Sequence, residues 1–224
     1  MSTPFGHIIL DFDGVLSDSL AVACEELNAI SARFYPVIPR AESAEDMTRV
    51  YCGPLQTSLR RFGLSDAETK DFFDRHSAAM QARASAIRPF DDVVRVVAEL
   101  PWQMCSIVTS SYSNAVREIV AKSPSYEEGM FRFICGRELK QPKSKKITDI
   151  LDAVGISSRQ ALHVGDTVSD LIYSRSVPIP FCAVGWGYHP LPYLRAFGPD
   201  FAVASATEFE RLVKESVFET ATVN

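Results

Sequence analysis

Residues 8–18 read Ile8-Ile9-Leu10-Asp11-Phe12-Asp13-Gly14-Val15-Leu16-Ser17-Asp18, an apolar run that ends in two carboxylates with a glycine behind them. A short apolar run that stops at polar residues predicts a buried β-strand. Ligands of open α/β sheets bind at the carboxyl ends of the strands, so we expect Asp11 and Asp13 to lie there together. Their mutual repulsion favours a divalent cation between them. Turn formation alone also accounts for Asp and Gly at such a junction.

Further short apolar runs recur along the chain, and helical patterns separate them. The strand candidates are residues 8–10, 104–108, 131–135, 161–164, 179–184 and 201–203. The helical patterns between and after them cover residues 91–100, 113–122, 144–154 and 206–213. Strands that alternate with helices predict an α/β fold, in which helices cover both faces of a Rossmann-like parallel sheet.

One interval breaks this alternation, because residues 18–88 contain helical patterns and no strand candidate. The predicted helices span residues 20–34, 43–51, 55–62 and 66–84, and they are separated by breaks at Pro36, Pro39, Pro54 and Gly63. A chain of 224 residues has room for one core domain with a smaller insert. We therefore predict a catalytic core of residues 1–17 and 89–224 and an inserted all-helical domain of residues 18–88.

Composition and charge restrict the class of protein. The net charge of −5 and the pI near 5.4 leave no overall basic field, so we expect no nucleic-acid partner. The five cysteines are scattered and have no zinc-ligand spacing, which is typical of a reduced compartment. The sequence shows neither a signal-peptide pattern nor an apolar run of membrane-spanning length. We expect a cytoplasmic protein with no membrane partner, and the sequence does not indicate its oligomeric state.

A second apolar run delivers carboxylates in the same way. Residues 161–170 read Ala161-Leu162-His163-Val164-Gly165-Asp166-Thr167-Val168-Ser169-Asp170. Asp166 and Asp170 are four residues apart, so a helix beginning here would carry both on one side. By itself this pattern is weak, because Asp also caps helices. Together with Asp11 and Asp13, it gathers the acidic oxygens that Mg²⁺ prefers.

Two further segments have groups that suit a phosphate. The run Ser106-Ile107-Val108-Thr109-Ser110-Ser111 ends a strand candidate in hydroxyl residues, and such hydroxyls and backbone N–H groups bind phosphate or merely cap the next helix. The run Lys140-Gln141-Pro142-Lys143-Ser144-Lys145-Lys146 supplies lysines that could neutralise phosphate charge. Most of a lysine cluster is solvated, so we expect at most one or two of the four to face a site.

These elements, in this order, resemble those of the haloacid dehalogenase superfamily. Asp11 and Asp13 match its first motif, Thr109 its second, and Gly165, Asp166 and Asp170 its fourth. The helical insert corresponds in position to the family's C1-type cap, and residues 184–188 are similar to a segment of phosphoglycolate-phosphatase-like members. The third motif departs from that subgroup's Lys-Pro pattern. The spacing of Lys143 to Asp166 and Ile147 is similar to that of phosphoserine-phosphatase-like relatives, so we choose Lys143, with Lys140 as the alternative.

The resemblance implies a Mg²⁺-dependent phosphatase that acts on a small phosphorylated metabolite. Asp11 would attack phosphorus and form an aspartyl-phosphate, while Asp13 would serve as general acid and base. The Mg²⁺ ligands would be the Asp11 carboxylate, the Asp13 backbone carbonyl and Asp166, with Asp170 holding the ion's water molecules. Lys143 would offset phosphate charge, and we expect substitution of Lys145 or Lys146 to be nearly neutral.

The resemblance also implies where phosphate and substrate bind. Thr109 would donate its hydroxyl to a phosphate oxygen, and Ser110 would add a backbone N–H. The inserted domain would close over the site and select the substrate, hinged near residues 17–19 and 88–90. Within it, the segment with Gly53 and Leu55 resembles the loop that such caps lower towards the substrate, and Arg60 or Arg61 could contact a substrate carboxylate.

Other functions remain open at this point. A β-phosphoglucomutase-like phosphosugar isomerase would carry the same core motifs. A dehalogenase would not need the second aspartate, Asp13, and a phosphonoacetaldehyde-hydrolase-like enzyme would need a cap lysine, for which the sequence offers Lys70. A non-catalytic phosphate-binding module on the same fold is the alternative outside enzymes, since a fold alone does not establish activity. Inside its apolar run, His163 is more typical of a core residue than of a catalyst.

Overall fold

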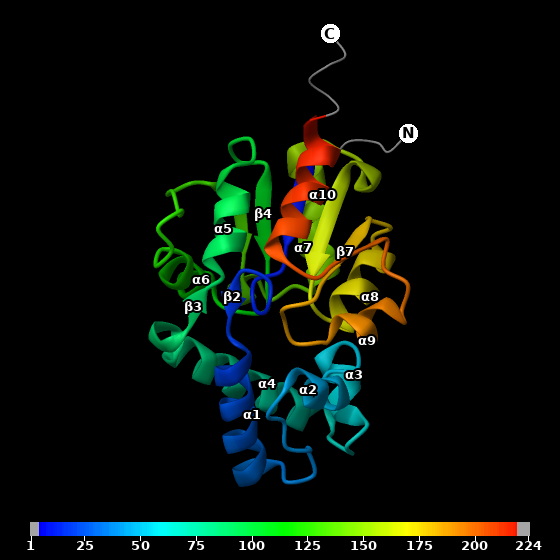
Figure 1. Cartoon of the computed structure of the whole chain (residues 1–224). Coiled ribbons are helices and arrows are strands. Elements are labelled where there is room, and N and C mark those ends of the chain that lie inside the picture. The colour runs from blue at the N-terminus through cyan, green and yellow to red at the C-terminus, as the bar shows by residue number, and fades with distance from the viewer. Residues whose placement is uncertain (1–4, 219–224) are drawn as a thin grey trace.

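The chain folds around one parallel sheet (Figure 1). The computed structural model describes residues 5–218, apart from the side chains of residues 55, 56, 217 and 218. The strands of the sheet are β1 (His7–Leu10), β4 (Cys105–Val108), β5 (Phe131–Cys135), β6 (Ala161–Gly165), β7 (Phe181–Val184) and β8 (Phe201–Val203). They lie in the order β5-β4-β1-β6-β7-β8, and each neighbouring pair is parallel. The predicted α/β fold is confirmed.

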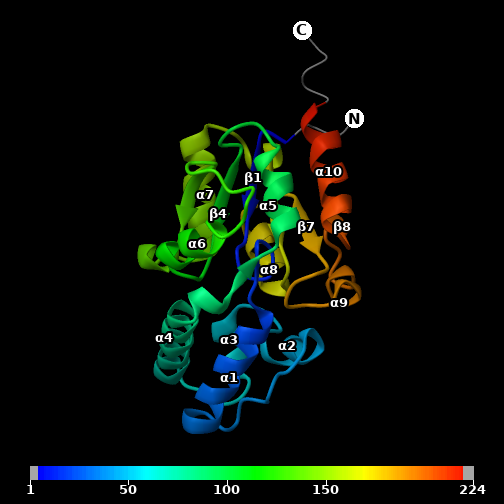
Figure 2. The same ribbon diagram turned by 60° about the vertical axis from the view of Figure 1, so that its left-hand side comes forward.

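Helices cover the sheet on both faces (Figures 1 and 2). They are α5 (Asp91–Ala98), α6 (Ser113–Val120), α7 (Lys143–Val154), α8 (Val168–Ser176) and α10 (Ala206–Phe218), where α5 contacts α10 and α7 contacts α8. Ile8 and Leu10 of β1 belong to the core cluster that α5 and α10 complete, whereas Ile9 packs with Ile147 and Ile150 of α7. Since side chains alternate between the faces of a sheet, a strand covered on both faces is apolar throughout.

A helical segment lies beyond the carboxyl ends of the strands (Figure 2). It comprises α1 (Leu20–Phe34), α2 (Ala44–Val50), α3 (Leu55–Arg60) and α4 (Asp66–Ala82). Helix α4 packs against both α1 and α3. Buried apolar side chains, among them Leu27, Met47, Leu59 and Phe72, fill the space between these helices. Ser65 begins α4 with a capping box that Glu68 completes.

Two short strands connect this segment to the sheet. β2 (Ser17–Asp18) and β3 (Arg88–Pro89) pair antiparallel, and the Phe90 N–H donates to the Leu16 carbonyl at 2.9 Å. The sequence pattern did not predict these strands, because a two-residue strand has no measurable periodicity. Their pairing places both chain connections side by side, at the two positions where a hinge was expected.

The remaining elements are short. They are α9 (Leu191–Arg195) and three 3-10 turns, η1 (Ala84–Ala86), η2 (Arg137–Leu139) and η3 (Ser158–Gln160). Neither α8 nor α9 was predicted from the sequence. Within the described part of the chain, no helix is both long and apolar enough to cross a membrane.

Candidate active site

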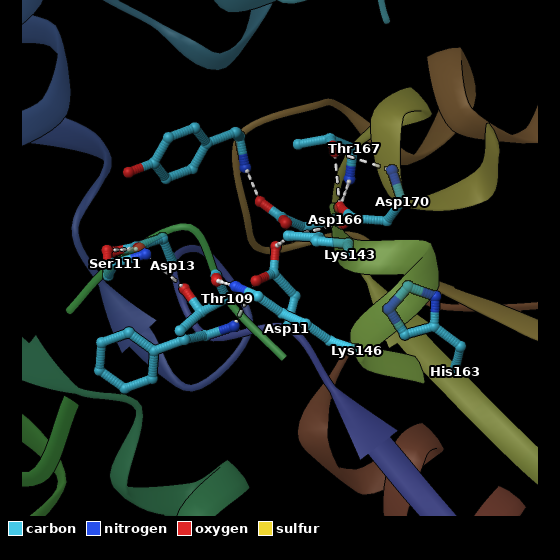
Figure 3. A network of polar contacts seen from close by, with 12 residues as sticks. Asp11, Asp13, Thr109, Ser111, Lys143, Lys146, His163, Asp166, Thr167 and Asp170 are labelled. Atoms are coloured by element: carbon cyan, nitrogen blue, oxygen red, sulfur yellow. Dashed lines mark hydrogen bonds and ion pairs between the residues drawn. The ribbon is translucent and has the colours of Figure 1, made fainter. Parts of the chain in front are cut away.

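Three neighbouring strands of the sheet end in the residues that the sequence singled out. Asp11 follows β1, Thr109 follows β4, and Asp166 follows β6 (Figure 3). Register explains this meeting: Leu10 pairs with Ile107 on one side and with Val164 on the other. Parallel pairing brings the carboxyl ends of all three strands to the same edge of the sheet.

Lys143 lies between two of the carboxylates. Its Nζ is 2.6 Å from Asp11 Oδ2 and 2.8 Å from Asp170 Oδ1, and the lysine side chain is 11% exposed. Lysine reaches this position because Pro142 directly precedes α7, which makes Lys143 the first residue of that helix. The alternative, Lys140, is exposed at the end of η2 in a left-handed conformation. The structure therefore brings Lys143, and not Lys140, to the aspartates.

Asp166 is fully buried and only half satisfied. Its Oδ2 accepts the Tyr188 N–H at 2.7 Å, whereas its Oδ1 has no hydrogen-bond partner among the described residues. Two glycines make room for this carboxylate: a Cβ at Gly14 would lie 2.0 Å from Asp166 Oδ2, and a Cβ at Gly187 would lie 2.3 Å from it. A buried oxygen without a donor costs free energy unless a cation or a proton occupies its free side.

The carboxylates of Asp11, Asp166 and Asp170 form a cluster that suits a hard divalent cation. One oxygen from each lies within 4.8 Å of the others. Both oxygens of Asp170 already have partners, because Oδ1 faces Lys143 and Oδ2 accepts the Thr167 hydroxyl at 2.5 Å. The unpartnered oxygen belongs to Asp166. An oxygen-rich site with an orphaned buried carboxylate is what Mg²⁺ requires, so the residues present fit such an ion.

Burial and mutual repulsion perturb these groups strongly. Burial raises the pKa of Asp11 to about 7 although Lys143 acts in the opposite direction, and burial also raises the pKa of Asp166 well above its usual range. Burial alone would raise the pKa of Asp170 too, but Lys143 beside it keeps that pKa below its usual range. The ammonium of Lys143 is stabilised in turn, because Asp11 and Asp170 outweigh desolvation and raise its pKa. A bound cation would favour the ionised form of every carboxylate here.

Asp13 lies on the opposite side of Asp11 from this cluster. Its Oδ2 accepts the Ser111 hydroxyl at 2.5 Å, and its Oδ1 accepts the Ser17 hydroxyl at 3.4 Å. The side chain is half-buried and lines the central cavity of the molecule. The contact from Ser111 was not anticipated, although this residue ends the hydroxyl run that drew attention to Thr109.

Thr109 is held from two directions. Its Oγ1 accepts the Ser111 N–H at 2.9 Å, and its carbonyl oxygen accepts the Lys146 Nζ at 2.8 Å. Lys146 is 3% exposed, and burial, with Lys143 nearby, lowers its pKa to about 8. The expectation that substitution of Lys146 is nearly neutral conflicts with this burial. Its signal in the sequence was helical spacing, since Lys146 lies three residues after Lys143 on the same helix.

These residues open into a cavity of about 180 Å³ between the sheet and the helical segment. The core side of the cavity is lined by Asp11, Asp13, Thr109, Ser110, Ser111, Lys143, Thr167, Ser169, Tyr173 and Tyr188. We call the opposite side, formed by Tyr51, Gly53, Phe73, His76, Ser77 and Met80, the helical wall.

The predicted specificity residues have different outcomes. Gly53 lines the cavity, as expected for the loop. The side chain of Leu55 lies outside the described residues. Arg60 pairs with Asp66 at 2.5 Å and is not among the described cavity residues, so the structure does not bring it to the site. Helix α4 was predicted from the sequence, but not that one of its faces lines the cavity, with residues 73, 76, 77 and 80 at helical spacing.

His163 occupies the core, as its apolar surroundings indicated. It is fully buried, its ring packs on Phe181, and its Nδ1 lies 2.5 Å from the Ser174 hydroxyl. Burial lowers the pKa of His163 to about 4, so the ring is neutral near pH 7. Lys70, the candidate for a Schiff-base lysine, is exposed and pairs with Asp74 at 2.6 Å.

Known proteins resemble this chain over most of its length. The family model described as haloacid dehalogenase-like hydrolase matches residues 8–184. The chain is similar to the phosphoglycolate phosphatase of Agrobacterium fabrum, with 23% identity over 92% of this chain and 94% of that protein. It is also similar to the phosphoglycolate phosphatase of Caulobacter vibrioides, with 27% identity over 88% of this chain and 86% of that protein. Among solved structures, a haloacid dehalogenase-like hydrolase from Streptococcus pneumoniae superimposes with a TM-score of 0.71, 19% identity, and coverage of 93% of this chain and 98% of that one.

Proposed function

The chain belongs to the haloacid dehalogenase-like hydrolase family, and on that premise we propose that it is a Mg²⁺-dependent phosphatase of a small phosphorylated metabolite. One observation carries the proposal: a buried aspartate and a lysine form an ion pair at the floor of one cavity, and the aspartate shares a carboxylate cluster with an unpartnered buried oxygen of Asp166. Relatives named phosphoglycolate phosphatase support a phosphoric monoester as the substrate. The modest volume of about 180 Å³ favours a small one.

Asp11 is the nucleophile in this proposal. Its Oδ1 accepts the Phe12 N–H at 2.7 Å and its Oδ2 faces Lys143, so the carboxylate is held in one orientation at the cavity floor. Attack on phosphorus forms an aspartyl-phosphate, which divides one hydrolysis into two easier transfers. The ammonium of Lys143 reduces the repulsion between the anionic nucleophile and the phosphoryl group.

Asp13 is the general acid and base. It protonates the departing alkoxide and later takes a proton from the water that cleaves the aspartyl-phosphate. The hydroxyl of Ser111 restrains the carboxylate so that it faces the cavity beside Asp11. This placement supports a phosphatase over a dehalogenase, which has no leaving alkoxide to protonate.

Phosphate oxygens are bound at the end of β4. Because Oγ1 of Thr109 already accepts a hydrogen bond from the Ser111 N–H, its own proton is available to a phosphate oxygen. Ser110 lies beside it on the cavity surface and adds its backbone N–H. Lys146 fixes the Thr109 carbonyl and so holds the loop in place without facing the substrate.

The cation would be held by the carboxylates of Asp11 and Asp166 and by the backbone carbonyl of Asp13. Asp170, whose oxygens already face Lys143 and Thr167, would act on water molecules around the ion. Bound Mg²⁺ would supply electrostatic stabilisation of the negative charge on the phosphoryl group.

We also propose that residues 18–88 form a mobile cap of C1 type over a core of residues 1–17 and 89–224. Both connections run through the paired strands β2 and β3, so one small hinge can move the whole segment. The cap supplies the helical wall, and its closure would exclude bulk water from the phosphoryl group.

The test is release of phosphate from p-nitrophenyl phosphate by the purified protein. We expect turnover with Mg²⁺, loss of turnover with EDTA, and an adduct on Asp11 when beryllofluoride is added. Free phosphate rather than an isomerised sugar phosphate distinguishes a phosphatase from a phosphosugar isomerase. Absence of turnover on a broad panel of phosphate monoesters with Mg²⁺ would contradict the proposal and favour a binding module.

A further inference from the structure

The helical wall differs from the rest of the cavity in having no charged side chain among its described residues. It comprises Tyr51 and Gly53, which lie between α2 and α3, and one face of α4. That face presents an aromatic ring, a thioether, a hydroxyl and an imidazole at spacings of three and four residues. A leaving group bonded to the phosphate would lie against this surface, because Asp11, Thr109 and Lys143 occupy the phosphate end.

No cation belongs to the wall among its described residues, and Lys143 and Arg137 contact carboxylates. Among the described cavity residues Lys143 is the one Lys or Arg, and its ammonium contacts Asp11 and Asp170. Arg137 lies with its guanidinium 4.0 Å from the centre of the Phe73 ring, on the core side, and pairs with Asp74. Arg61 donates to the Cys52 sulfur at 2.6 Å, next to the wall, but it does not line the cavity. A second anionic group on the substrate would therefore meet Asp13 and find no cation on the wall itself.

His76 does not supply the missing charge. Its Nε2 lies 3.3 Å from the Ala23 carbonyl oxygen, which can only accept, so the ring proton belongs on Nε2. The ring is stacked on Phe72, and burial lowers its pKa below the usual value. The neutral ring keeps Nδ1 as an acceptor, which suits a hydroxyl donor and repels a carboxylate. Ser77 adds a hydroxyl beside it.

We propose that the helical wall binds an uncharged leaving group, a carbon skeleton that carries hydroxyl groups, and discriminates against phosphate esters that bear a second anion. This inference rests on the proposed phosphatase function. A buried carboxylate without a cation loses its hydration and gains no partner. A hydroxyl group can form hydrogen bonds with His76 and Ser77, and the carbon skeleton can pack against Phe73 and Met80. Sites built from hydrogen-bonding groups reject mismatched analogues by large factors.

The experiment compares esters that differ in one group. The pairs are sn-glycerol 1-phosphate with 3-phospho-D-glycerate, and 2-hydroxyethyl phosphate with 2-phosphoglycolate, each exchanging a CH₂OH for a carboxylate. We expect kcat/KM to be at least about tenfold higher for the uncharged member of both pairs. Equal efficiency, or preference for the carboxylate, would overturn the inference.

A charge placed on the wall gives the converse result. Ser77→Lys should shift the ratio by about tenfold or more towards the carboxylate esters, because the new ammonium supplies a partner. Ala78→Lys is the matched control, since this neighbouring residue of α4 is exposed and does not line the cavity. The control should leave the ratio unchanged, and an equal shift in both variants would contradict a role for this wall.

Binding separates this inference from the proposed function. Calorimetry of the same four esters with Asp11→Asn protein and Mg²⁺ measures affinity without turnover. If the wild type hydrolyses none of the esters but the uncharged members bind more tightly, the phosphatase proposal fails and the wall's preference stands. If the carboxylate members bind as tightly or better, the inference fails whatever the activity.

Discussion

The two sides of the cavity are built in opposite ways. Behind the core side, Asp11, Asp166 and Asp170 are buried, and the half-buried Lys143 joins Asp11 and Asp170 through ion pairs. The helical wall carries uncharged side chains on one face of a helix that belongs to the inserted segment. The core side is fixed by six-stranded pairing, whereas the wall is joined to the core by two short strands. In the proposed function, this difference assigns the phosphoryl transfer to the residues at the end of the sheet and the selection of the leaving group to the insert.

The strongest way to break this division is to remove the nucleophile. Asp11→Asn should lower kcat by about 10³-fold or more for every ester, because the amide cannot form the covalent intermediate. The rate of phosphate release measures this loss of kcat. The control is Asp152→Asn, because Asp152 is an exposed aspartate on α7. A variant that keeps a tenth of wild-type turnover would show that the covalent mechanism is wrong.

Removing the lysine should have the next largest effect. Lys143→Ala should lower kcat/KM by about 10²-fold or more across substrates, because the phosphoryl charge and Asp11 lose their cation. Lys140→Ala removes an exposed ammonium and should leave kcat/KM nearly unchanged. Steady-state kinetics on both variants decide between them, and an inactive Lys140→Ala protein would reassign the third motif.

A methyl group added beside the carboxylate cluster should separate an effect on cation binding from an effect on stability. Gly14→Ala places a Cβ 2.0 Å from Asp166 Oδ2, and the residue also has a φ of 78°. Gly63 has a φ of 86° with no atom within 4 Å of its Cβ position, so Gly63→Ala introduces the backbone strain alone. Both variants should lose about 1–2 kcal/mol of unfolding free energy from strain.

Only Gly14→Ala should also weaken cation binding, by about tenfold or more, since the Asp166 carboxylate must move. Thermal unfolding and a Mg²⁺ titration of activity separate the two effects. Similar Mg²⁺ dependence in both variants would mean that Asp166 is not a ligand.

The smallest expected effect concerns the support of the phosphate loop. Lys146→Met keeps the apolar stem but leaves the buried Thr109 carbonyl without its donor, which should cost about 1–3 kcal/mol of unfolding free energy and lower kcat/KM a few-fold. The exposed Lys145, which pairs with Asp149, provides the control Lys145→Met. Chemical denaturation and steady-state kinetics on both proteins check the expectation. Equal unfolding free energies and equal kcat/KM values in the two variants would mean that Lys146 does not support the loop.

Much of the fold followed from local pattern. Apolar runs ending in polar residues predicted all six strands of the sheet to within two residues, because a strand covered on both faces must be apolar throughout. Helix α8 was not predicted, because its inward side carries Asp170 and Ser174, which removes the apolar periodicity of a helix. Both residues have polar partners inside the molecule: Asp170 faces Lys143 at the site, and Ser174 contacts His163 in the core.

The sequence by itself determined which strands end in carboxylates and hydroxyls and that a helical segment separates the first motif from the second. These features are local in the chain, so spacing and hydrophobic pattern express them directly. Only the tertiary structure decided that Lys143 rather than Lys140 meets Asp11, and that Arg60 faces Asp66 instead of the cavity. The first outcome depends on how α7 packs beside β4 and α8, and the second on how α3 meets the start of α4. Packing between elements sets both, so the linear pattern does not express them. The roles assigned to the individual site residues stay predictions that the variants above can decide.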